Sequence, residues 1–201
     1  MFSKRSEYSL IGLDIGKSSV KMVQLVRDNG RFRIQSFSSK PICLKEDSKE
    51  KIIESIKMAY KDGSFKGNNV VTFLPNSEVD LRQITVQSEK HEEIVKAIGF
   101  EADSYLPYKA KGAVLDYIEI GDILTNGEKK KKILMVAAQR KKIEEMLEIT
   151  KTANLKCIAI DILPMAQLRA VREIDYVKKE ATFSVIDIGY EKSTVSIFNE
   201  G

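Results

Sequence analysis

Residues 10–21 read LIGLDIGKSSVK, and residues 183–195 read FSVIDIGYEKSTV. Both stretches share one order of residue types: an apolar run, then Asp-Ile-Gly, then hydroxyl-bearing residues, then a second apolar run. An apolar run that stops at a glycine and resumes a few residues later is typical of two strands joined by a tight turn. The sequence therefore predicts two similar β-hairpins, each with an aspartate at the end of its first strand.

A hairpin of this kind is suited to holding phosphate. Glycine lets the backbone turn tightly and approach a ligand, and backbone N–H groups and serine hydroxyls in the turn can hold phosphate oxygens. A lysine on the second strand can reach a phosphate as a point charge, and carboxylates at the strand ends can hold Mg²⁺ through water. The candidate phosphate-binding residues are Asp14, Gly16, Lys17, Ser18, Ser19, Lys21, Asp187, Gly189, Ser193 and Thr194, and the metal candidates are Asp14 and Asp187.

The simpler interpretation is that each motif is an ordinary turn. A single Asp-x-Gly after a strand is common in turns without function, and Lys17 is either a phosphate contact or a solvated turn residue. Two copies with the same framing favour a clamp made of both hairpins. Walker A and Gly-x-Gly-x-x-Gly patterns are absent from the sequence. The sequence therefore does not support a P-loop or a Rossmann nucleotide-binding site.

Composition excludes several classes of function. The 201 residues are 43% hydrophobic and 31% charged with a formal charge of +4, which argues against disorder and does not by itself imply nucleic acid. The two cysteines, Cys43 and Cys157, form no CxxC pair, and His91 is the single histidine. A disulfide framework, a multi-histidine metal site and a Ser-His-Asp triad are therefore not expected. The cysteine usage fits a reduced cytoplasmic setting. No apolar run approaches the roughly 18 residues of a membrane span, so we expect any membrane role to be peripheral or through a partner.

Hydrophobic periodicity, caps and turn residues predict a mixed α/β (α+β) fold. Asn29-Gly30 predicts a tight hairpin between the second and third strands, and residues 121–132 are expected to form a polar, mobile loop. The predicted strands are 9–16, 19–26, 31–38, 69–74, 79–86, 113–120, 133–138, 155–160, 182–188 and 194–198. The predicted helices are 49–60, 89–106, 141–153 and 164–178.

At the two Asp-Ile-Gly hairpins the sequence resembles the actin/Hsp70/sugar-kinase superfamily, and the middle of the chain resembles the PilM family. The most specific part is a helix that runs through glutamate and tyrosine to leucine-proline, followed by Leu-Asp-Tyr. The segments that carry the resemblance are VVTFLP at 70–75, LRQIT at 81–85, IGFEADSYLP at 98–107, VLDY at 114–117, ILMVAA at 133–138, LKCIAID at 155–161 and PMA at 164–166.

This resemblance implies an actin-like ATPase (ribonuclease H-like) first lobe with an FtsA-type inserted subdomain and the start of a second lobe. Residues 1–77 and 162–180 would form the first lobe, 78–161 the partner-binding insert, and 181–201 the first hairpin of the second lobe. It also implies a cytoplasmic scaffold of type IV pilus assembly, peripheral at the inner membrane. Such a scaffold binds ATP with Mg²⁺, the N-terminal cytoplasmic tail of a PilN-like inner-membrane protein, and other pilus assembly proteins.

Two departures from the family pattern bear on the nucleotide binding and ATP hydrolysis that the resemblance implies. The chain ends at Gly201, just after the second hairpin, so the nucleotide site is expected to be incomplete here. Relatives often carry an acidic residue where Leu163 stands. We therefore expect little or no ATP hydrolysis, assign no catalytic residue, and expect Gln167 on a helix surface. A phosphotransferase of the same superfamily and an FtsA-like cell-division protein are the alternatives.

Overall fold

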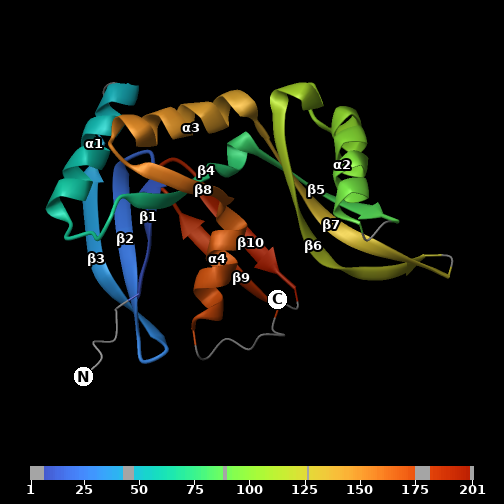
Figure 1. Cartoon of the computed structure of the whole chain (residues 1–201), viewed down its shortest axis with the longest axis horizontal. Coiled ribbons are helices and arrows are strands. Elements are labelled where there is room, and N and C mark those ends of the chain that lie inside the picture. Colours follow the sequence, from blue (N-terminus) through green and yellow to red (C-terminus); the bar gives the residue numbers. More distant parts are fainter. Residues whose placement is uncertain (1–6, 43–47, 88–89, 126, 175–181, 200–201) are drawn as a thin grey trace. The chain divides into compact units, whose positions relative to one another are not determined.

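The computed structural model describes residues 7–42, 48–87, 90–125, 127–174 and 182–199. By internal contacts it divides into two compact units: unit 1 comprises Met1–Phe73 and Met146–Gly201, and unit 2 comprises Leu74–Glu145. The chain is drawn in Figure 1. The insert proposed from the sequence, residues 78–161, shares residues 78–145 with unit 2, whereas the strand at 156–162 pairs within unit 1.

Unit 1 is built on a five-stranded sheet with the strand order β3-β2-β1-β4-β8. β1 lies antiparallel to β2 and parallel to β4, and β2 lies antiparallel to β3. The alternation of buried and exposed residues along β2 gives the sheet a core face and an opposite face. The strands are β1 Glu7–Ile15, β2 Ser19–Asp28, β3 Arg31–Pro41, β4 Asn69–Leu74 and β8 Lys156–Ile162.

Two helices contribute to the core of unit 1. α1 (Lys49–Asp62) begins after Ser48, whose side chain accepts a hydrogen bond from the Lys51 N–H and thereby caps the helix. The second half of α3 (Arg140–Thr152) brings Ile149 against the same core. The fully buried side chains at the centre come from three strands and α1: Ile11, Val20, Met22, Ile56, Ala59 and Val70.

The turn between β2 and β3 confirms the predicted tight hairpin. Asn29 and Gly30 both have positive φ, 50° and 82°. Positive φ at both central residues is what a type I′ turn needs, and Asn-Gly is the pair that tolerates it best.

β9 (Phe183–Ile188) and β10 (Ser193–Phe198) form the second predicted hairpin, as a two-stranded sheet of its own. The rings of Phe183 and Phe198 stack with centroids 5.0 Å apart. The Ser196 hydroxyl donates to Gln167 Oε1 at 2.6 Å, which ties β10 to α4 (Leu163–Arg172). α4 ends at Arg172 rather than at the predicted 178, and residues 175–178 lie outside the described residues.

Unit 2 is a three-stranded antiparallel sheet, β5-β7-β6, with α2 (His91–Tyr105) packed on one face. β5 is Val79–Val86, β6 is Ala113–Thr125 and β7 is Glu128–Gln139; short 3₁₀ turns lie at Asn76–Glu78 and Ala110–Gly112. Its core is separate from that of unit 1 and includes Ile94, Ile98, Ile133 and Met135.

The prediction of a polar loop at residues 121–132 is wrong, because β6 and β7 continue through it. The polar residues there pair across the ladder: Lys129 Nζ lies 3.0 Å from Asp122, and Lys131 Nζ lies 2.7 Å from Glu119. Opposite charges facing each other support a strand pair that has no apolar pattern.

Tyr108 joins the segment after α2 to the edge of the unit 2 sheet. Its hydroxyl donates to Asp80 Oδ2 at 2.7 Å, and burial together with this hydrogen bond raises the pKa of Tyr108 above its ordinary value. Beside it, the Arg82 guanidinium lies 4.2 Å from the centre of the Tyr105 ring. Among the described helices of both units, none has the length and apolar character of a membrane-spanning helix.

Candidate functional site

The first Asp-Ile-Gly hairpin forms as predicted and closes with a tight turn. The Gly16 N–H donates to the Ser19 carbonyl oxygen at 3.0 Å. A Cβ on Gly16 would lie 3.1 Å from that same oxygen, so the close turn favours glycine. Ser18 is also held in place, because its carbonyl oxygen accepts the Ile42 N–H at 2.8 Å.

Asp14 and Lys21 face each other across this hairpin. They are partners in the β1–β2 register, and Lys21 Nζ lies 3.4 Å from Asp14 Oδ2. Both side chains are substantially exposed, at 53% for Lys21 and 37% for Asp14. An exposed pair at this distance is weak, so each group keeps the freedom to meet a ligand.

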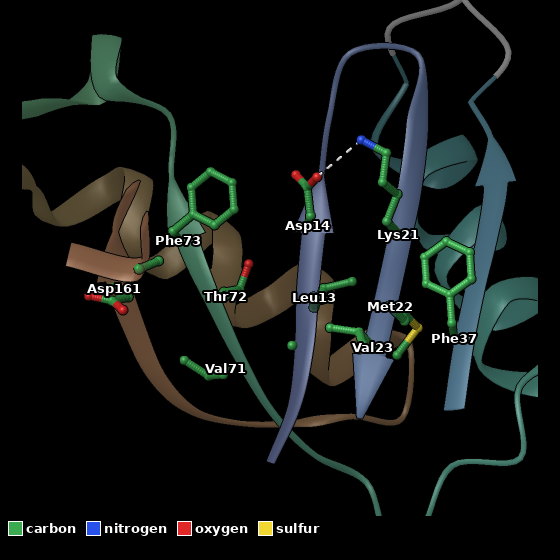
Figure 2. A pocket seen from close by; sticks show the side chains of 12 residues that line it. Leu13, Asp14, Lys21, Met22, Val23, Phe37, Val71, Thr72, Phe73 and Asp161 are labelled. Carbon is green, nitrogen blue, oxygen red and sulfur yellow. Dashed lines mark hydrogen bonds and ion pairs between the residues drawn. The ribbon is translucent and has the colours of Figure 1, made fainter. Parts of the chain in front are cut away.

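A cavity of about 370 Å³ opens beside this pair on the face of the sheet opposite the core (Figure 2). Its surface is mainly apolar, and its charged groups are Asp14, Lys21 and Asp161. The lining residues are Gly12, Leu13, Asp14, Lys21, Met22, Val23, Phe37, Val71, Thr72, Phe73, Asp161 and Ala166.

The cavity lies where β1 and β4 diverge. Their parallel ladder pairs Ile11 with Val70 and Gly12 with Val71, and Asp14 and Phe73 lie beyond the last of these pairs. In open α/β sheets, ligands bind outside the carboxyl ends of such strands. The topology therefore places Asp14 at the mouth of a ligand-sized opening.

Asp161 is a site residue that the sequence reasoning missed. It lies near the end of β8 and forms an ion pair with Arg169 of α4, and its Oδ1 accepts the Ile162 N–H at 2.8 Å. Figure 2 shows it across the cavity from Asp14. The signal was present in the sequence, since Asp161 ends an apolar strand as Asp14 and Asp187 do.

The second hairpin repeats the turn of the first. The Gly189 N–H donates to the Lys192 carbonyl oxygen at 3.0 Å, and a Cβ on Gly189 would lie 2.7 Å from that oxygen. Asp187 faces Thr194 in the β9–β10 register, as Asp14 faces Lys21. The structure therefore supports the internal repeat of the two turns.

The predicted phosphate residues are only partly brought together. Asp14 and Lys21 line the cavity, and Gly16, Lys17, Ser18 and Ser19 belong to the adjoining hairpin. Asp187, Gly189, Ser193 and Thr194 are not among the cavity's lining residues. A clamp made of both hairpins therefore stays a prediction.

The donor set suits a hydrated hard cation better than a directly bound metal. Within the described residues there is no group of three His, Cys, Asp or Glu side chains that could hold a metal. Two carboxylates, Asp14 and Asp161, do line the cavity. Mg²⁺ keeps several waters and needs few protein oxygens, so these residues fit Mg²⁺ held through water.

Comparison with known proteins assigns the family. A family model described as type IV pilus assembly protein PilM matches residues 12–201. The chain belongs to the PilM family. The family resemblance expected from the sequence is thereby confirmed.

Two solved structures similar to this PilM-family chain support the predicted fold class. The structure "PilM-PilN type IV pilus biogenesis complex" matches with a TM-score of 0.82 at 24% identity, over 95% of this chain and 58% of that one. The cytoplasmic domain of EpsL, an inner membrane component of the type II secretion system of Vibrio cholerae, matches with a TM-score of 0.53 at 9% identity, over 77% of this chain and 57% of that one. These likenesses confirm the mixed α/β, actin-like fold, and the chain spans less than two thirds of either structure's chain.

Proposed function

We propose that this chain is a scaffold of type IV pilus assembly that binds ATP with Mg²⁺ and the N-terminal cytoplasmic tail of a PilN-like inner-membrane protein. The observation that carries the pilus role is the PilM family model, which extends over residues 12–201. The partner is suggested by the similar solved structure of a PilM–PilN type IV pilus biogenesis complex. Such a protein works in the cytoplasm and reaches the inner membrane, and other pilus assembly proteins, through that partner.

The nucleotide part of the proposal is supported by the geometry of the first hairpin. The Asp14–Lys21 pair of this hairpin lines a cavity at the carboxyl ends of the strands, and the glycine turn with its hydroxyl residues lies between these two residues along the chain. Lys21 would contact phosphate oxygens and Asp14 would hold Mg²⁺ through water. Mg²⁺ would neutralise the phosphate charge, and the role proposed for the chain is binding rather than turnover.

A peptide titration tests the scaffold role. The chain would be titrated with a synthetic peptide of the partner's cytoplasmic tail and with a scrambled peptide of equal composition, each with and without Mg-ATP. We expect saturable binding of the native peptide alone. If neither condition gives binding above the scrambled peptide, the proposed partner is wrong, and the phosphotransferase and cell-division alternatives reopen.

A substitution tests the nucleotide role separately. We expect Asp14→Ala to keep the melting temperature of the ligand-free chain and to reduce the stabilisation by Mg-ATP, because it removes a carboxylate from the cavity mouth. Asp28→Ala is the control, since Asp28 is also an exposed aspartate in an ion pair, with Arg33 at 3.4 Å, but does not line the cavity. Equal stabilisation of both variants by Mg-ATP would remove Asp14 from the site.

A further inference from the structure

The two faces of the unit 2 sheet differ in burial. On the face that α2 covers, Ile133 and Met135 are 0% exposed and Ile84 is 8% exposed. Residues of the opposite face alternate with these along each strand. Leu81 on that face is 40% exposed, and its other large aliphatic side chains are partly exposed: Val79, Val114, Ile118, Leu134 and Val136. This side of the sheet, the open face, therefore presents apolar side chains to solvent.

The strand register gives the arrangement of the open face. Residues paired directly across strands lie on the same face, so each row joins one residue of β5, β7 and β6 in turn. The rows are Val79–Ala138–Val114, Leu81–Val136–Asp116, Gln83–Leu134–Ile118 and Thr85–Lys132–Gly121. The charged members of these rows are Asp116 in the second and Lys132 in the fourth, and the Leu134 row lies between them.

These two charges differ from those of the neighbouring ribbon. Lys129 and Lys131 each form an ion pair with an acidic residue of β6. Asp116 Oδ1 accepts the Tyr117 N–H at 2.8 Å, and within the described residues neither Asp116 nor Lys132 has an ion-pair partner. An interface between two identical copies related by a two-fold axis uses the same patch on both. One unpaired charge of each sign, on either side of an apolar row, suits such an interface.

Stacking two open faces with their strands antiparallel brings these charges together. If the Leu134 rows of the two copies are superposed, the second row of one copy faces the fourth row of the other. Asp116 of each copy then lies about one strand spacing, roughly 5 Å, to the side of Lys132 of the other. The two-fold axis gives two such pairs, while the apolar residues of the rows pack between the sheets. Complementary charges of this kind fix the register of an interface more than its affinity.

The size of the open face sets the strength of such a contact. Three strands about 4.8 Å apart and four rows about 7 Å apart cover roughly 350 Å². Stable, specific interfaces bury about 800 Å² on each partner. The open face is smaller than that, so it suits a weak, concentration-dependent dimer.

We propose that the open face of unit 2 is a contact between two copies of this chain. The two open faces stack with antiparallel strands, and Asp116 of each copy pairs with Lys132 of the other. The inference goes beyond the proposed function, because neither nucleotide binding nor tail binding requires a second copy.

Charge reversal tests the pairing. Sedimentation equilibrium would measure self-association of the full chain around the expected dissociation constant of roughly 10–100 μM. Asp116→Lys and Lys132→Asp each bring like charges together, so each should weaken the dimer at least about tenfold. The double variant Asp116→Lys/Lys132→Asp restores opposite charges and should associate within about threefold of the unmodified chain. Rescue by the double variant is a result that a purely structural role of either residue would not give.

Two further variants serve as controls. Glu92→Lys makes the same change of charge as Asp116→Lys, but at an exposed position in the first turn of α2, on the other side of the sheet. It should leave the dissociation constant unchanged. Leu81→Ser removes an exposed aliphatic side chain from the open face and should weaken the dimer about fivefold. Melting temperatures of all variants show whether each is folded.

Three outcomes would overturn the inference. The first is an unmodified chain that stays monomeric at about 1 mM, well above the expected dissociation constant. The second is a dimer that both single charge reversals leave intact, because another surface then mediates it. The third is a monomer in which a peptide of the partner's tail protects β5, β6 and β7 from hydrogen exchange, which would assign the open face to that peptide.

Discussion

At the scale of single residues, Gln24 shows how one buried polar side chain fixes local structure. It is 1% exposed in the middle of β2. Its Nε2 donates to the carbonyl oxygens of Ser9 and Lys66, both at 2.9 Å, and its Oε1 accepts the Lys66 N–H at 2.7 Å. The side chain thereby satisfies backbone groups at a bulge of β1 and in the segment before β4.

We expect Gln24→Leu to lower the free energy of unfolding by about 2–3 kcal/mol, because it leaves three backbone groups without their partner. Urea unfolding followed by circular dichroism measures the change. Gln83→Leu in β5 is the control, since Gln83 is exposed, and its effect should stay within about 0.5 kcal/mol. Equal effects of the two substitutions would show that the Gln24 hydrogen bonds add no stability.

At the scale of secondary-structure elements, the β9–β10 hairpin stands out because neither of its strands joins the five-stranded sheet of unit 1. Its two strands form a sheet of their own, and one of its faces leaves four aliphatic side chains exposed: Ile186 at 63%, Ile188 at 80%, Val195 at 60% and Ile197 at 75%. A two-stranded hairpin is marginally stable in water by itself. Its stability in this chain therefore depends on contacts such as that of Ser196 with Gln167.

Hydrogen exchange tests this view of the hairpin. We expect amides of β9 and β10 to exchange at least about tenfold faster than those of β1 and β2, which lie inside a five-stranded sheet. Gln167→Ala should accelerate exchange in β10 further and leave β1 unchanged. Protection in the hairpin equal to that of β1 would contradict this expectation.

The elements also show what the sequence could and could not predict. The Asp-Ile-Gly hairpins, the Asn29-Gly30 turn and the Ser48 cap follow from local chemistry, and each is present in the structure. The extension of β6 and β7 through residues 121–132 was missed, because charge pairs between strands such as Lys129–Asp122 leave no periodicity along one strand.

The candidate site likewise combines residues that the sequence predicted with one that it did not. Asp14 and Lys21 were predicted from a motif within one hairpin, and they do face each other. Asp161 joins them at the cavity only through the sheet order β1-β4-β8, which brings together strands that lie far apart in sequence. A site assembled across strands in this way cannot be found from spacing along the chain.

At the scale of the whole molecule, the two compact units have separate apolar cores. Met22 in β2 belongs to the core of unit 1, and Met135 in β7 belongs to that of unit 2; both are 0% exposed. The chain passes between the units at residues 73–74 and 145–146, and the second passage lies within α3. Separate cores allow each unit to open locally without the other.

This separation leads to a prediction with a matched pair of substitutions. Met22→Ala and Met135→Ala each remove a fully buried methionine from a strand, and each should cost its own unit about 2–5 kcal/mol. In hydrogen exchange followed by mass spectrometry, Met135→Ala should reduce protection in β5, β6 and β7 and leave β1 and β2 protected, whereas Met22→Ala should do the reverse. If either substitution reduces protection equally in both units, the two cores unfold as one cooperative structure, and the prediction of independent opening is wrong.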